Sequence, residues 1–140
     1  MSRIRGAEPT GMFLIGEGAI AAVAALLFLG AGIQRLATYT TSGDDYADGI
    51  SVLLIGVTFL IAVVLAAYAP AAVLIGRAVK RGVHSAWIAG LVLSAAQMAL
   101  AFILWPLVLP LALLGAAALL LLLLPETRSE CAPPPVLEDV

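Results

Sequence analysis

The run Ile50–Gly76, ISVLLIGVTFLIAVVLAAYAPAAVLIG, decides the fold class because it carries no charged residue over 27 positions. A helix needs about 20 apolar residues to cross the ~30 Å hydrocarbon layer of a bilayer. The run is continuous rather than alternating, which excludes a strand of a transmembrane barrel. Only helices and closed barrels satisfy every backbone polar group in lipid, so this run predicts a transmembrane helix.

Three further apolar runs resemble it in length, at 12–37, 85–105 and 107–124. The 140-residue chain is 63% hydrophobic and 11% charged, whereas soluble domains are about half apolar and about a quarter charged. We therefore predict an all-α polytopic membrane protein with a four-helix transmembrane bundle over residues 12–124. A short segment, 1–11, precedes the bundle, and a flexible cytoplasmic tail, 125–140, follows it.

Aromatic and proline residues mark the ends of the third and fourth spans. Trp87 and Trp105 are 18 residues apart, about 27 Å along a helix, and tryptophan favours the two membrane interfaces. Pro106 and Pro110 can each open a helix, since proline is tolerated in a first helical turn. The sequence leaves open which of them begins the fourth span.

The basic residues predict the orientation of the chain. Six of the seven, all except Arg35, fall on one side of a four-span arrangement, and this side should face the cytoplasm. Both termini are then cytoplasmic, and the acidic loop 38–49 faces outward. The first run is longer than the apolar part of a signal peptide and contains Glu17, so we expect it to be retained.

Glu17 is the one acidic residue inside a predicted span. Small residues at Gly16, Gly18 and Ala21 let neighbouring backbones approach, which predicts that Glu17 faces the interior. By depth along their helices, Tyr68 and Ser94 lie near its level, with Gln97 closer to the midplane. We predict an intramembrane polar cluster of Glu17, Tyr68, Ser94 and Gln97. It is either a hydrogen-bonded helix contact or a proton or cation site.

A compact basic loop joins the second and third spans and carries Arg77, Lys80 and Arg81. Such residues attract anionic headgroups, at about 1 kcal/mol for each charge near the surface, so we predict an anionic-lipid contact here. The net charge of −2 indicates no nucleic-acid surface. We also expect no catalytic site, metal or cofactor, because no motif for them occurs.

Two family resemblances bear on function. The GEG at 16–18, GRAVKRG at 76–82 and LLLLPETR at 121–128 resemble uncharacterised small four-helix integral membrane proteins of actinobacteria, which implies fold and location only. A glutamate in the first helix is similar to that of small multidrug resistance transporters, in which it exchanges protons for cationic drugs. The strong charge bias and the long acidic loop of this chain depart from that second pattern.

These features favour a non-catalytic plasma-membrane protein, serving as a structural or accessory subunit that packs through small-residue helix faces. Its expected partners are the lipid bilayer and either other membrane subunits or further copies of itself. The alternative is a proton-coupled small transporter that uses Glu17.

Overall fold

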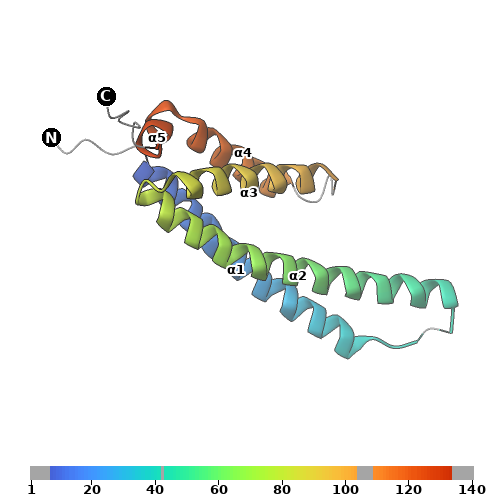
Figure 1. Ribbon diagram of the computed structural model, residues 1–140. Helices are drawn as coiled ribbons and strands as arrows, with labels where there is room; N and C mark the ends of the chain where they lie inside the picture. The colour runs from blue at the N-terminus through green and yellow to red at the C-terminus, as the bar shows by residue number, and fades with distance from the viewer. Residues whose placement is uncertain (1–6, 42, 104–108, 134–140) are drawn as a thin grey trace, which may run out of the picture. The chain divides into compact units, whose positions relative to one another are not determined.

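The computed structural model describes residues 7–41, 43–103 and 109–133, and every regular element among them is a helix (Figure 1). The all-α class predicted from the sequence is confirmed for these residues. The helices are α1 (Ala7–Thr38), α2 (Asp45–Lys80), α3 (His84–Ile103), α4 (Leu109–Leu123) and α5 (Pro125–Glu130).

The chain divides into two compact units. The hairpin unit is Gly18–Ala71, which holds most of α1 and α2 and the turn that joins them. The terminal unit holds the residues on either side: the start of α1, the end of α2, and all of α3, α4 and α5.

Two helices, α1 and α2, are long and apolar enough to cross a membrane. Their most apolar 18-residue windows are only 28% and 11% buried, respectively, unlike the core helix of a soluble protein. These two helices therefore fit a helical membrane protein. The apolar parts of α3 and α4 are shorter, at His84–Leu100 and Ala112–Leu123.

Both long helices extend past the apolar runs that predicted them, because polar residues stabilise their ends. The N–H of Tyr46 donates to Oδ1 of Asp44 at 3.1 Å, which caps the start of α2. Arg77 and Lys80 lie in the last turn of α2, where positive charge is favourable to the helix dipole. The ends of α2 thus lie five residues before and four residues after the predicted run 50–76.

The fourth span and the tail also differ from the prediction. The α4 helix begins at Leu109, so Pro110 is the proline in its first turn, and Pro106 lies outside the described residues. The predicted flexible tail begins with a helix, α5, because Pro125 starts a new helical turn directly after α4. Residues 134–140 of the predicted tail lie outside the described residues, as do Trp105 and the basic residues Arg3 and Arg5.

The hairpin unit has a narrow interior and a wide apolar surface. A Cβ atom on Gly32 would lie 3.2 Å from Cζ of Phe59, so the phenyl ring fills the space beside that glycine. Thr58 is buried and donates its hydroxyl to the carbonyl of Leu54 in its own helix at 2.7 Å. The interior is otherwise built largely from alanine, while many leucine and valine side chains of both helices point outward.

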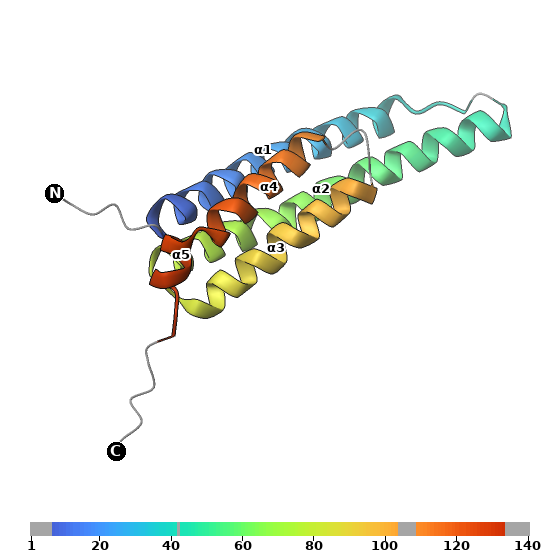
Figure 2. The same cartoon turned by 90° about the horizontal axis from the view of Figure 1, so that it is seen from above.

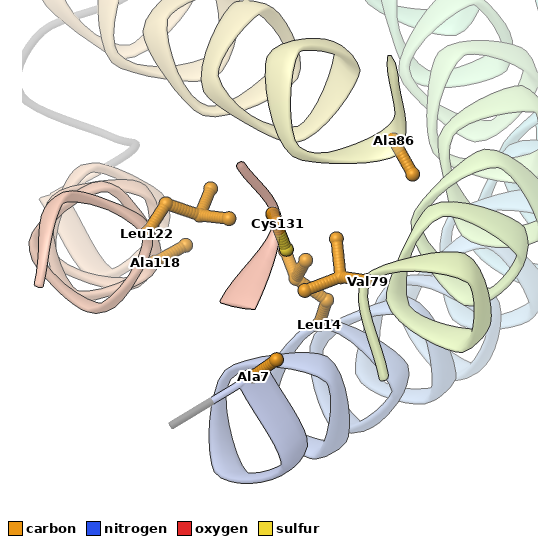
Figure 3. Close-up of a cluster of buried hydrophobic side chains, with 7 residues drawn as sticks. All are labelled: Ala7, Leu14, Val79, Ala86, Ala118, Leu122 and Cys131. Carbon is orange, nitrogen blue, oxygen red and sulfur yellow. The ribbon is translucent and has the colours of Figure 1, made fainter. Parts of the chain in front are cut away.

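The terminal unit packs around a small apolar core, with α3 beside α4 (Figures 1 and 2). Figure 3 shows the side chains of this core, which come from α1, α2, α3 and α4 and from the residue after α5. They are Ala7, Leu14, Val79, Ala86, Ala118, Leu122 and Cys131. The C-terminal segment therefore forms part of the core and is not a separate tail.

Candidate functional site

The terminal unit contains a very close helix contact at Gly11 of α1 and Gly76 of α2. A Cβ on Gly76 would lie 2.7 Å from the carbonyl oxygen of Gly11, and one on Gly11 would lie 2.5 Å from that of Gly76. A Cβ on Gly11 would also collide with Cγ of Lys80. Only glycine allows backbones to approach this closely, so these two residues set the spacing of α1 and α2 in this unit.

Contacts at other glycines show which turns of neighbouring helices lie side by side along the helix axes. Gly76 also lies against Ile15 of α1, and Gly90 of α3 lies against Ile75 of α2 and Leu122 of α4. Neighbouring helices run antiparallel, so the alignment given by these contacts can be continued by one helical turn. It brings Ala72, Ser94 and Ala118 to about the level of Glu17. All four of these residues are buried.

Glu17 belongs to the buried face of α1, which repeats at helical spacing through Thr10, Leu14, Glu17 and Ala21. It is 3% exposed, and neither of its carboxylate oxygens has a hydrogen-bond partner among the described residues. Burying a carboxylate without a partner is unfavourable. Glu17 is therefore the most unusual polar group in the described part of the chain.

The residues predicted to surround Glu17 are distributed between the two units. Ser94 and Gln97 are 1% and 5% exposed and lie on α3 in the terminal unit. Tyr68 is half-buried and lies in the hairpin unit. The hydrogen-bonded contact, one of the two interpretations of the predicted cluster, is absent for Glu17 within the described residues. Gln97 instead packs on α4, since a Cβ on Gly115 would lie 3.2 Å from its Cδ.

A second polar cluster, which the sequence analysis missed, joins α1 to the C-terminal segment. The hydroxyls of Thr10 and Thr127 lie 3.1 Å apart, and both reach the carbonyl oxygen of Leu121. Glu130 Oε2 accepts the N–H of Ala7 at 2.8 Å, so a carboxylate satisfies a free donor at the α1 N-terminus. The one available sequence signal is the position of Thr10 on the same helical face as Leu14 and Glu17.

Two aromatic side chains at the start of α3 make hydrogen-bond contacts with α4 and with the residue after α5. Trp87 Nε1 donates to the carbonyl of Leu122 at 2.8 Å, and His84 Nδ1 lies 2.7 Å from the carbonyl oxygen of Cys131. The two rings stack with centroids 5.7 Å apart. Burial raises the pKa of the Cys131 thiol, and the nearby Glu130 carboxylate raises that pKa further. The thiol is therefore kept protonated.

The basic residues predicted to contact lipid are all exposed at the end of α2. Lys80 directs its ammonium group to the sulfur of Met12 at 3.4 Å. The chain turns sharply after Arg81 at Gly82, whose φ of 72° favours glycine. Arg77 in the last turn of α2 and Arg81 in the turn after it are four residues apart, and both are exposed.

The described ranges contain no group of three His, Cys, Asp or Glu side chains placed to bind a metal ion. Comparison with known proteins gave no match to a family model, to a curated protein or to a solved structure. The arrangement therefore offers two features that bear on function: a buried acid without a hydrogen bond, and long apolar helices that are mostly uncovered.

Proposed function

We propose that this chain is a non-catalytic integral membrane protein of four spans that acts as a structural or accessory subunit. The observation that carries this proposal is the exposed face of α2, where Gly56 has no atom within 4 Å of its Cβ position and lies among exposed leucines and valines. Glycine within a helix costs about 1 kcal/mol relative to alanine. An open glycine on an apolar face is suited to a close contact with another transmembrane helix.

Charge and length support the remaining parts of the proposal. Of the basic residues, only Arg35 lies near the turn between α1 and α2, which favours a plasma-membrane protein with both termini in the cytoplasm. The α3 helix has 20 residues, about 30 Å in length, and so can span with α1 and α2. The 15 residues of α4 reach about 22 Å, so a fourth span would need local thinning of the bilayer.

The subunit proposal predicts association within the membrane. The full chain should form a defined complex in mild detergent and at low density in lipid vesicles, where single-molecule photobleaching counts the copies. Gly56→Leu should disrupt self-association, while Val63→Leu, which adds one methylene group on the same exposed face, should leave it intact. A chain that remains monomeric in both environments and binds no constant second subunit would overturn the proposal.

The second candidate is a proton-coupled small transporter, and the unpartnered burial of Glu17 favours it. In that case, vesicles containing the chain should take up a cationic dye when a pH gradient is imposed. Glu17→Gln should abolish this uptake without changing assembly. Uptake that is equal for empty vesicles, wild type and Glu17→Gln would exclude transport of that dye and leave the subunit role in place.

A further inference from the structure

The outward face of α2 changes from apolar to basic at its cytoplasmic end. Leu74 is 64% exposed. Arg77 follows it at helical spacing on the same face, and the exposed Arg81 lies in the turn directly after the helix. Residues at this spacing lie above one another along a helix. If Leu74 faces lipid tails, the last turn of α2 and the turn after it carry the two guanidinium groups toward the level of the lipid phosphates.

The two arginines differ from their neighbour Lys80 in the contacts that they make. Lys80 is directed to Met12, whereas no salt bridge or hydrogen bond of the Arg77 or Arg81 side chain occurs within the described residues. The N–H of Arg81 bonds the carbonyl of Ala78 at 3.1 Å, so its backbone is held in a tight turn directly after α2. Two exposed guanidinium groups, one turn apart, thus remain available at one place.

We propose that Arg77 and Arg81 form a binding site for the phosphate of an anionic phospholipid. A guanidinium group presents paired N–H donors that match phosphate oxygens, and two of them one turn apart can hold one headgroup between them. The continuous apolar face that ends at Leu74 selects a lipid rather than a soluble phosphate, because it accommodates the acyl chains. The site rests on the proposed membrane location but not on the structural role.

Native mass spectrometry of the full chain in detergent tests the site with phosphatidylglycerol and phosphatidylcholine added in equal amounts. Wild type should bind phosphatidylglycerol preferentially. Each removed charge should reduce that preference about five-fold, and Arg77→Gln with Arg81→Gln should nearly abolish it. The distant Arg35→Gln, used as a matched control, should change it less than two-fold.

A variant with lysine in place of both arginines keeps the positive charge and should retain a reduced preference for phosphatidylglycerol. It keeps the site testable if the glutamine variant misfolds. The site is refuted if the glutamine pair keeps the wild-type preference, or if Arg35→Gln lowers it equally. Displacement of the lipid by inorganic phosphate would instead identify a free-phosphate site and overturn the lipid assignment. A chain that stays soluble without detergent would overturn both the membrane location and this site.

Discussion

Substituting Gly76 with alanine tests the packing of the terminal unit most directly. The new Cβ would lie 2.7 Å from the Gly11 carbonyl oxygen and 3.1 Å from the backbone nitrogen of Ile15. Carbon–oxygen contacts are ordinarily no closer than about 3.3 Å, so α1 and α2 must separate by roughly half an ångström at this point. Both close atoms belong to the backbone and cannot rotate away.

The expected cost follows from two opposing terms. Forcing a methyl group into a packed interface costs about 1–3 kcal/mol, and a contact with two backbone atoms favours the upper part of this range. Alanine gains about 1 kcal/mol over glycine in helix propensity. Gly76→Ala should therefore destabilise the chain by about 2 kcal/mol. Gly16, in α1, has no atom within 4 Å of its Cβ position, so Gly16→Ala should be neutral or stabilising.

Cys131 provides the assay, because it is the single cysteine of the chain and its side chain is fully buried. A maleimide dye that fluoresces on reaction with the thiol reports thermal unfolding in detergent. At about 4 °C for each kcal/mol, Gly76→Ala should lower the Tm by several degrees relative to wild type. A Gly76→Ala variant with a Tm equal to or above that of Gly16→Ala would refute the close backbone contact.

Three further predictions concern the polar groups of the terminal unit. Thr127→Val should lower the Tm in the same assay, because it removes the hydroxyl that lies 3.1 Å from the buried Thr10 hydroxyl, at a cost of about 1–3 kcal/mol; an unchanged Tm would contradict this. Glu17→Gln should not lower the Tm, because its oxygens have no hydrogen bond among the described residues to lose. A large decrease would reveal a partner of the carboxylate. Burial raises the pKa of Cys131, so its neutral thiol contributes stability that is present below the unfolded-state pKa and lost as pH rises above about 8.5. Followed by tryptophan fluorescence, wild type should lose stability above that pH relative to Cys131→Ser, and parallel pH profiles would contradict the raised pKa.

Apolar run length was sufficient to predict helices but not their ends. The run 50–76 predicted α2, yet the helix continues from Asp45 to Lys80 because capping and the helix dipole act on polar residues. The same limitation concealed α5, whose sequence PETRSE is polar and resembles a tail. Its position depends on hydrogen bonds to Thr10 and Ala7, more than 100 residues away, and no local pattern encodes such a pairing.

The candidate site around Glu17 was also only partly predictable from the sequence. The small residues around Glu17 predicted an inward orientation, and the carboxylate is buried. Its partner could not be predicted, because hydrogen bonding depends on ångström-level helix spacing that residue depth alone does not provide. Depth estimates placed Ser94 near the level of Glu17, and the glycine contacts between helices support the same register.

The position of Glu17 relative to the Gly11–Gly76 contact links the two proposed functions. Two backbones in contact leave no room for a side chain between them at the glycines, and Glu17 lies on a later turn of α1. If the glycine contact is rigid, it separates this carboxylate from the N-terminal end of α1. Glu17 then acts as a buried structural acid, whereas proton exchange would require α1 and α2 to separate at the glycines. Gly76→Ala, which forces that separation, should thus increase any Glu17-dependent proton flux while lowering stability, and a purely structural Glu17 would show the second effect alone.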